Sequence, residues 1–145
     1  MLTAIVCGLL TGARGYKAIA QWTRVQGASV WHWLGFQRRP PCANSFRNLL
    51  LVAGEHPKFV SNNYLEQCAR VVHAEFPSVS LEVGPMETEE YRPIVAAGAE
   101  GLVVYQETYD REVYASMHTA GPKRNFDWRL ETPERAYAAG FRRLG

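Results

Sequence analysis

The stretch LLLVAGEHPKFVSNNYLEQCARVVHAEFPSVSLEVGP, residues 49–85, predicts a strand, a helix and a second strand. Residues 49–53 form a short apolar run ended by Gly54, which is typical of a buried strand in a parallel sheet. Residues 65–76 place apolar side chains at helical spacing, and a proline then ends the helix. Residues 79–83 alternate apolar and polar side chains before a Gly-Pro turn. We therefore expect a strand–helix–strand unit here.

The same alternation continues toward the carboxyl terminus. Residues 88–98 predict a short helix capped by its first threonine, with a later start or a kink at Pro93. The remaining expected elements are a strand at 101–106 and helices at 111–118 and 132–140. Three strands are too few for the eight of a closed barrel. The expected fold class is therefore α/β, a partial TIM-type (βα) barrel fragment of three βα units, cut from a longer protein.

Residues 1–48 show a different pattern and predict an all-α segment. The side chains of Ala13, Tyr16, Ile19, Ala20 and Thr23 share one helix face. A second helix is expected to begin near residue 46. We therefore divide the chain into a helical segment, 1–48, and a barrel fragment, 49–145.

The opening apolar run, residues 1–13, is shorter than the roughly 20 residues that a membrane-spanning helix needs. It also lacks a positively charged start and a cleavage site. We expect a buried helix, no membrane partner and a cytoplasmic protein.

Charge and cysteine usage narrow the function classes. The net charge of +2 is too small to argue for a nucleic acid or an anionic membrane. Residues 1–48 nevertheless hold six Arg or Lys and no Asp or Glu, which fits either a nucleic-acid-facing segment or a chance basic stretch. Cys7, Cys42 and Cys68 lack the spacing of metal ligands, so no metal site is expected.

Candidate site residues follow the predicted strands, because working residues of βα barrels lie at the carboxyl ends of strands. Glu55 comes directly after the first strand, where it could bind a ligand's ammonium group or simply cap the next helix. Gln106 and Glu107 are polar residues in an otherwise apolar strand, and buried polar groups need partners. Arg129 could clamp a carboxylate or lie on the surface.

Three strings resemble one enzyme family: residues 49–65, residues 82–109 (EVGPMETEEYRPIVAAGAEGLVVYQETY) and residues 126–145 (FDWRLETPERAYAAGFRRLG). They resemble the radical S-adenosylmethionine (SAM) lyases of bacterial thiazole synthesis, the 2-iminoacetate synthases, which are related to biotin synthase. The resemblance implies a (βα) barrel that binds a [4Fe–4S] cluster and cleaves SAM to a 5′-deoxyadenosyl radical. That radical would split tyrosine into dehydroglycine and p-cresol for thiamine synthesis.

The resemblance also implies roles for single residues. Glu55, in the Gly-Glu pair after the strand, would hold the methionyl ammonium of SAM. Gln106, Glu107 and Thr108 would contact its ribose and methionyl part, and Arg129 would bind its carboxylate. No catalytic residue is assigned. The family's C-x3-C-x2-C cluster motif is absent from this sequence, so we expect the chain alone to be inactive.

Partners follow from the same resemblance, and an alternative follows from the first segment. A separately encoded cluster-bearing half, or a thiazole synthase, would be the partner of a split lyase. Residues 2–27 and 34–50 resemble the amino-terminal domain of H-repeat insertion-sequence transposases. The alternative is therefore a transposase-derived DNA-binding remnant with a passenger tail. Arg38, Arg39 and Arg47 would then face DNA phosphates, or simply keep the surface polar.

Overall fold

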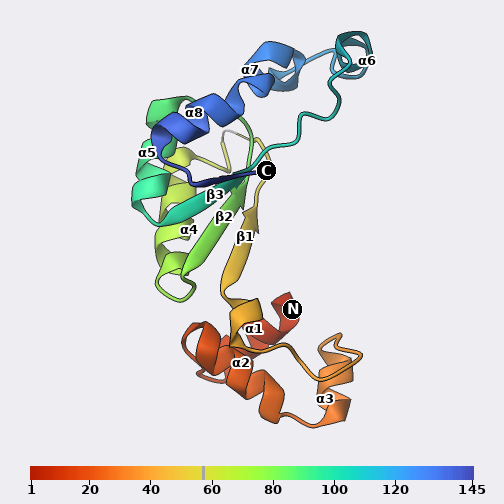
Figure 1. Cartoon of the computed structure of the whole chain (residues 1–145), viewed down its shortest axis with the longest axis vertical. Helices are drawn as coiled ribbons and strands as arrows, with labels where there is room; N and C mark the ends of the chain where they lie inside the picture. The colour runs from red at the N-terminus through yellow and green to blue at the C-terminus, as the bar shows by residue number, and fades with distance from the viewer. Residues whose placement is uncertain (57) are drawn as a thin grey trace.

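A computed structural model describes residues 1–56 and 58–145, and it contains a sheet of parallel strands in the order β1-β2-β3-β4 (Figure 1). The strands are β1 (Asn48–Val52), β2 (Ser78–Glu82), β3 (Ala99–Val103) and β4 (Arg143–Leu144). Neighbouring strands all pair in parallel. The predicted α/β fold is thus confirmed. The first two strands are each shifted by one residue, β3 covers residues 99–103 rather than 101–106, and a short β4 follows the last helix.

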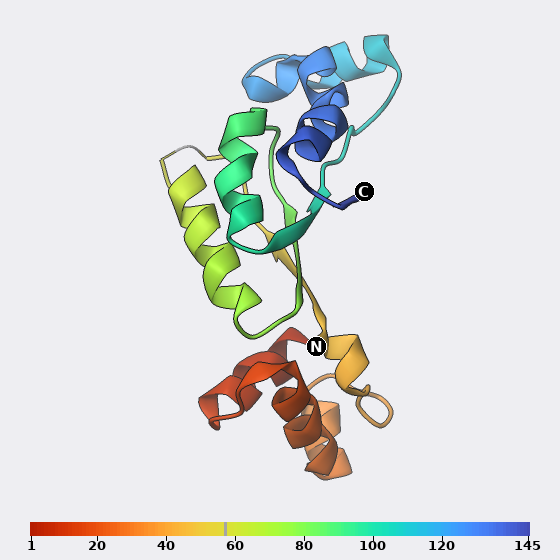
Figure 2. The ribbon, with the colours of Figure 1, turned by 60° about the vertical axis from the view of Figure 1, so that its left-hand side comes forward.

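Three helices cover one face of this sheet (Figure 2). They are α4 (Asn62–His73), α5 (Thr88–Ala96) and α8 (Thr132–Ala139). Their apolar sides meet the sheet in a core that includes Leu65, Leu81, Ile94, Leu102 and Ala136. The strands and the helices that cover them therefore alternate along the chain, as the sequence predicts.

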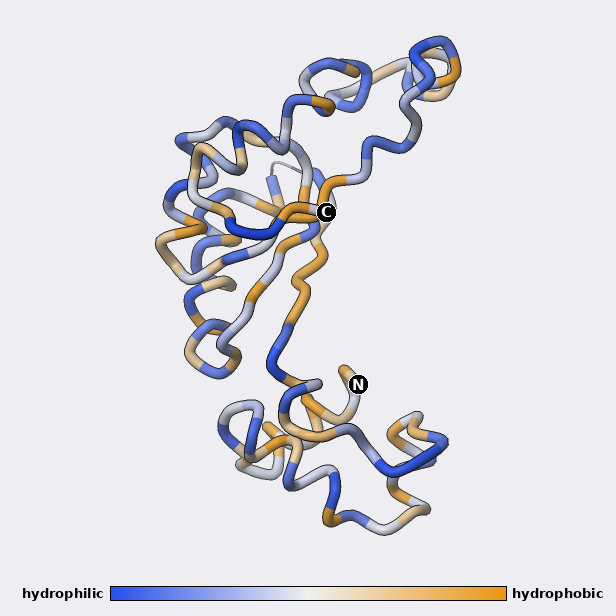
Figure 3. The backbone as a smooth tube through the Cα atoms, in the orientation of Figure 1, coloured by the Kyte–Doolittle hydropathy of each residue, from blue (hydrophilic) through white to orange (hydrophobic). Residues whose placement is uncertain are grey.

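The opposite face of the sheet is open, and β1 is an edge strand (Figure 3). Leu50 is 47% exposed and Val52 is 67% exposed. The prediction of a fully buried first strand is therefore wrong for this chain. Alternate side chains of β1 point to opposite faces of the sheet, so a fully buried strand needs packing on both faces. Here helices pack on only one face.

Two helix starts differ from the predictions by one residue. Glu87, not Thr88, caps α5, and it forms a reciprocal capping box with Glu90. Thr132 is the first residue of α8 rather than its cap, and its hydroxyl donates to the carbonyl of Trp128. Each threonine thus lies just inside its helix.

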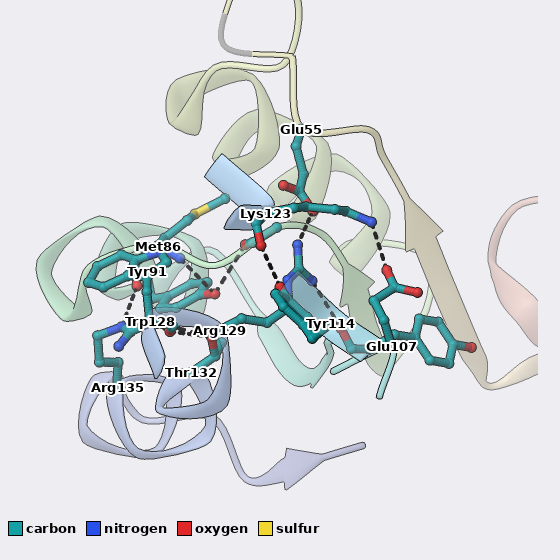
Figure 4. Close-up of polar contacts among 12 residues, drawn as sticks. Glu55, Met86, Tyr91, Glu107, Tyr114, Lys123, Trp128, Arg129, Thr132 and Arg135 are labelled. Carbon is teal, nitrogen blue, oxygen red and sulfur yellow. Dashed lines mark hydrogen bonds and ion pairs between the residues drawn. The ribbon is translucent and has the colours of Figure 1, made fainter. Parts of the chain in front are cut away.

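Between β3 and α8, the chain forms an arm that the sequence patterns showed only in part. It contains α6 (Arg111–Met117), the 3-10 turn η2 (Pro122–Arg124) and α7 (Phe126–Leu130). The carboxylate of Asp110 caps α6 by accepting from two backbone N–H groups. The short helix α7 was not predicted. It directs Arg129 back toward the strands (Figure 4).

The amino-terminal lobe is helical, as predicted. It contains α1 (Leu2–Leu10), α2 (Gly15–Val25), α3 (Ala28–Trp33) and the 3-10 turn η1 (Ala43–Phe46). Two expectations are wrong. No helix begins at Phe46, because β1 starts two residues later. The opening helix is not buried as a whole, since Leu2 is 71% exposed and Leu10 is 82% exposed. None of the helices in the described residues is long and apolar enough to cross a membrane.

The lobe shares its core with the βα part. Phe46 and Ile19 of the lobe belong to the same buried cluster as Phe76, which lies between α4 and β2. Leu49 and Val72 pack against that cluster. The backbone N–H of Tyr16 also donates to the carbonyl of Glu75 at 3.2 Å. The two segments therefore meet through a packed interface.

Candidate functional site

A cavity of about 350 Å³ lies where the carboxyl ends of β1, β2 and β3 meet. Parallel strands present these ends at one edge of the sheet, so the residues that follow them surround a common mouth. Charged side chains reach the cavity from the loop after β1, from the end of β2 and from the arm. The residues that line it include Glu55, Glu82, Gly84, Glu107, Lys123 and Arg129.

Arg129 is the most deeply placed charge in this cavity (Figure 4). Its side chain is 4% exposed, and its Nη2 lies 2.6 Å from Oε1 of Glu55. Its Nη1 donates to the carbonyl of Tyr105 at 3.0 Å. Its Nε is buried and has no partner among the described residues. A buried guanidinium with an unused donor is poised to accept another anionic group.

The Glu55 carboxylate packs closely against the backbone of Gly84. A Cβ atom on Gly84 would lie 2.5 Å from Cγ of Glu55, too close for any side chain. The glycine after β2 therefore lets Glu55 lie across the mouth and reach Arg129. Glu55 keeps 29% of its side chain exposed, so its carboxylate remains accessible to a ligand.

Tyr91 and Arg135 hold the walls of the cavity in place (Figure 4). The Tyr91 hydroxyl accepts from the N–H of Met86 and donates to the carbonyl of Gly84. Burial raises the pKa of Tyr91 to about 12. The guanidinium of Arg135 donates to the carbonyl of Met86 and stacks 3.6 Å from the ring centroid of Trp128. These contacts join the loop after β2 to the α7–α8 corner that carries Arg129.

Glu107 and Lys123 form a second ion pair in the same cavity, with 2.7 Å between Oε1 and Nζ. Glu107 was predicted within a strand, but it lies in the loop after β3. Its backbone adopts φ +73°, a left-handed conformation that residues other than glycine rarely use. The Lys123 ammonium holds the pKa of Glu107 below its ordinary value, and Arg129 and His118 add to that effect.

The other two predicted residues lie in the same loop but do not line this cavity. Gln106 is half-buried, and its Nε2 has no hydrogen-bond partner in the part of the chain that the structure describes. The hydroxyl of Thr108 accepts from the N–H of Asp110, which shapes the start of α6. Of the five predicted site residues, the cavity therefore brings together Glu55, Glu107 and Arg129.

Lys123 and Gly84 are cavity residues to which the sequence patterns assigned no role. Lys123 lies in the Gly-Pro-Lys turn, about 20 residues from any predicted strand, so no strand-end rule points to it. Gly84 was assigned only to a turn. A basic residue that could face the acidic strand-end loop is the only signal for Lys123 in the sequence, and it does not separate Lys123 from Arg111 or Arg124.

The cysteines do not fit an iron–sulfur cluster. Cys7 lies in α1, Cys42 precedes η1, and Cys68 lies in α4. No group of three or more His, Cys, Asp or Glu residues gathers at metal-binding distance within the described residues. A cluster needs several thiolates that converge on one point. The described residues therefore provide no cluster site.

The cavity suits a ligand that carries both charges of an amino acid. An ammonium group could bind the Glu55 carboxylate while a carboxylate binds the Arg129 guanidinium. The two residues already satisfy each other, so such a ligand would insert between them and replace their ion pair with two new ones. The glycines and valines at the strand ends leave an apolar floor for the rest of the ligand.

Comparison with known proteins finds relatives for about two thirds of the chain. No family model matches. The 2-iminoacetate synthases of Salmonella typhimurium (strain LT2) and Escherichia coli (strain K12) are each 41% identical over 100 residues. That match covers 69% of this chain and 26% of each relative. The chain thus spans about a quarter of the length of the curated relatives that it matches.

Solved structures point to the same group. HydG, described as a maturase of the [FeFe]-hydrogenase, matches with a TM-score of 0.64 and 28% identity over 68% of this chain and 23% of its own. HydG from Carboxydothermus hydrogenoformans matches with a TM-score of 0.62 and 32% identity, over 68% of this chain and 24% of its own. Methylornithine synthase (PylB) matches with a TM-score of 0.56 and 26% identity, over 68% of this chain and 29% of its own. The chain is therefore related, over part of its length, to radical SAM enzymes of the 2-iminoacetate synthase and HydG type. None of these findings supports the transposase resemblance of residues 1–48, which stays a prediction.

Proposed function

We propose that this chain is the SAM-binding part of a radical SAM carbon–carbon lyase of the 2-iminoacetate synthase type. The Glu55–Arg129 ion pair at the mouth of the parallel strands is the observation that carries the proposal. Glu55 would bind the α-ammonium of SAM and Arg129 its α-carboxylate. In the related enzymes, SAM supplies a 5′-deoxyadenosyl radical that attacks an amino acid substrate. Tyrosine is the substrate that the resemblance implies.

Two features of the cavity support this assignment. The buried Nε of Arg129 has no partner among the described residues, so a carboxylate gains a donor that the protein leaves unused. Glu55 is partly exposed and can turn from Arg129 toward a ligand's ammonium group without leaving the cavity. The chain's own part in the reaction is therefore to bind and orient the amino acid end of SAM. Gln106 and Thr108, in the loop below, would support the ribose side.

We also propose that a cluster-bearing half supplies what the radical step needs beyond the described site. The described cysteines do not converge, so the [4Fe–4S] cluster must be held by residues outside the described site. Both β1 and β4 are sheet edges, where further strands of a barrel could pair. A cluster-bearing half of a split lyase would fit these edges, and a thiazole synthase would use the product.

Calorimetric titration tests the binding. S-adenosylhomocysteine, which keeps both the amino acid and the nucleoside of SAM, should bind the wild-type chain. Glu55→Gln and Arg129→Met should each weaken binding by roughly tenfold or more, because each removes a charged hydrogen bond. The matched control is Arg70→Gln, which breaks an exposed ion pair with Glu66 on α4 and should leave affinity unchanged. Equal affinity in all four proteins would refute the site.

Reconstitution tests the need for a partner. After anaerobic incubation with iron and sulfide, the chain alone should show no [4Fe–4S] absorbance and should form no 5′-deoxyadenosine from SAM and a reductant. Tyrosine should not change this. Formation of p-cresol by the chain alone would overturn the inference. Formation of p-cresol only with an added cluster-bearing half would support it.

A further inference from the structure

The outer edge of β1 lacks the features that usually keep a sheet edge from pairing. Among the described residues, β1 pairs with β2 alone. Its sequence, NLLLV, contains no charged residue and no proline, and its register with β2 is unbroken by a bulge. Natural edge strands carry such devices because unpaired backbone groups otherwise recruit another strand. The outer edge of β1 is therefore suited to a further strand.

Alternate residues of β1 present their backbone groups to this edge. The N–H of Ala53 donates to the carbonyl of Glu82 at 3.0 Å, so the odd-numbered residues of the strand bond to β2. The even-numbered residues, Asn48, Leu50 and Val52, therefore direct N–H and C=O groups outward. The side chains of Leu50 and Val52 are exposed together on the open face of the sheet. A strand added here gains backbone hydrogen bonds and apolar contacts at once.

The two ends of β1 differ in charge. The lobe at its amino end, residues 1–47, contains six basic and no acidic residues (Figure 1). Residues 48–145 contain ten basic and fourteen acidic residues. Four of these acids lie at the end of β2 and the start of α5, namely Glu82, Glu87, Glu89 and Glu90. The strand thus runs from a basic lobe toward acidic loops.

We propose that the chain forms a symmetric dimer in which the β1 strands of two copies pair antiparallel, with the two-fold axis at Leu50. In this register, Leu50 lies opposite its own counterpart, and Asn48 lies opposite Val52 of the partner subunit. All three residues present their backbone groups to the other strand, so about six hydrogen bonds join the copies. The Leu50 and Val52 side chains of the two copies pack on the open face. The interface is isologous and closes on itself.

Charge favours a second copy in this orientation. Antiparallel pairing places each lobe beside the acidic loops of the other copy, with Arg47 opposite Ala53 of the partner subunit. Parallel pairing would instead set two lobes of six positive charges side by side, where they repel. A nucleic acid offers no peptide groups to the edge and would meet the acidic loops. A helix would leave the outward N–H and C=O groups of β1 unpaired.

This inference goes beyond the proposed function and does not depend on it, because it uses only β1 and the charges at its two ends. A cluster-bearing half that pairs with β1 would meet the same edge. Such a half would therefore have to displace the second copy.

Sedimentation equilibrium over a concentration series tests the dimer. Wild type should reach the mass of two chains of 16.3 kDa each. Leu50→Lys sets two ammonium groups face to face at the axis and should raise the dissociation constant at least roughly tenfold. Its circular dichroism should match wild type, because this side chain lies on the open face. The matched control is Val71→Lys on α4, at a residue that is 70% exposed, and it should dimerise like wild type.

Disulfide trapping tests the register in folded protein. Opposite residues of a hydrogen-bonded antiparallel pair have Cα atoms about 5.5 Å apart, a separation that a disulfide spans. The background carries Cys7→Ser, Cys42→Ser and Cys68→Ser. In this background, Leu50→Cys should form a covalent dimer under oxidised glutathione. Val71→Cys is the exposed control and should remain mostly single chains over the same time.

Each contrary result overturns the proposal. A wild-type chain that keeps the mass of one copy at every concentration excludes the dimer. A Leu50→Lys chain that dimerises as tightly as wild type shows that the copies meet elsewhere. Equal trapping of Leu50→Cys and Val71→Cys excludes the register. Raising NaCl from about 0.05 M to about 0.5 M should weaken the wild-type dimer several-fold, and a salt-independent dimer would contradict the role of charge.

Discussion

Arg129 and Glu55 are 74 residues apart in the chain, yet Nη2 and Oε1 lie 2.6 Å apart at the carboxyl ends of the strands. The burial of the two partners is unequal: the Arg129 side chain is 4% exposed and the Glu55 side chain 29%. The free-energy cost of removing one partner therefore depends on how deeply the other partner is buried. A stranded Glu55 can turn to water, whereas a stranded Arg129 stays buried with a carbonyl as its partner.

This asymmetry gives a first prediction. Glu55→Ala should lower the free energy of unfolding by roughly 2–3 kcal/mol, less than for a fully buried pair because Glu55 touches solvent. Arg129→Met, which removes the charge and keeps an apolar stem, should cost less than Glu55→Ala. Urea unfolding of both variants measures the difference. The reverse order would show that Arg129 is not the stranded charge.

A second prediction concerns alkaline pH. The folded chain holds the proton of buried Tyr91 to a pKa of about 12, and unfolded tyrosine ionises near 10. As the pH rises above 10, the unfolded state loses this proton first, so stability falls until the folded phenol ionises as well. Between these pH values, wild type should lose roughly 2–3 kcal/mol more than Tyr91→Phe. Parallel pH curves for the two proteins would contradict this.

The left-handed backbone at Glu107 gives a third prediction. Glu107→Gly and Glu107→Ala both lose the ion pair, but only alanine keeps the strain of φ +73°. Glu107→Gly should therefore unfold with a free energy about 1 kcal/mol higher than Glu107→Ala. Thermal unfolding of the pair is the measurement. Equal stability would mean that the loop relaxes when the ion pair is lost.

The shared core of the two segments gives a fourth prediction. Phe76 is 4% exposed and packs with the amino-terminal helices. Phe76→Ala should lower the free energy of unfolding by about 3–5 kcal/mol. Tyr137→Ala, at a residue that is 75% exposed, should change it little.

Tryptophans in both parts allow this to be followed by fluorescence. Trp22 packs in the lobe core, and Trp128 lies in α7. Single-tryptophan variants should report one unfolding transition for both positions, and Phe76→Ala should shift both together. Two separate transitions would contradict a common core and would favour independent units.

The sequence patterns predicted the alternation of strands and helices along the chain because the periodicity is local. The apolar run before Gly54 and the alternation before Gly84 need no distant contact to be recognised. The exposure of Leu50 was not predictable in the same way, because it depends on what covers the other face of β1. The end of β3 was also missed, since Val104 and Tyr105 continue the apolar run beyond Val103 without a turn signal.

The candidate site was predictable only in part. Glu55 follows a strand directly, so the rule of carboxyl ends identifies it. Arg129 was proposed from its neighbours and from resemblance, but its place depends on α7, a five-residue helix with little periodicity to detect. Lys123 depends on the path of the whole arm. Residues that reach a site over long loops leave no local pattern, and the structure is needed to find them.

A crystal structure of the chain with S-adenosylhomocysteine tests the central claim most directly. We expect the ligand at the carboxyl ends of β1–β3, with its ammonium bonded to Glu55, its carboxylate bonded to Arg129, and the direct contact between these residues broken. A ligand bound elsewhere, or bound in the cavity while the 2.6 Å contact between Glu55 and Arg129 persists, would contradict the account.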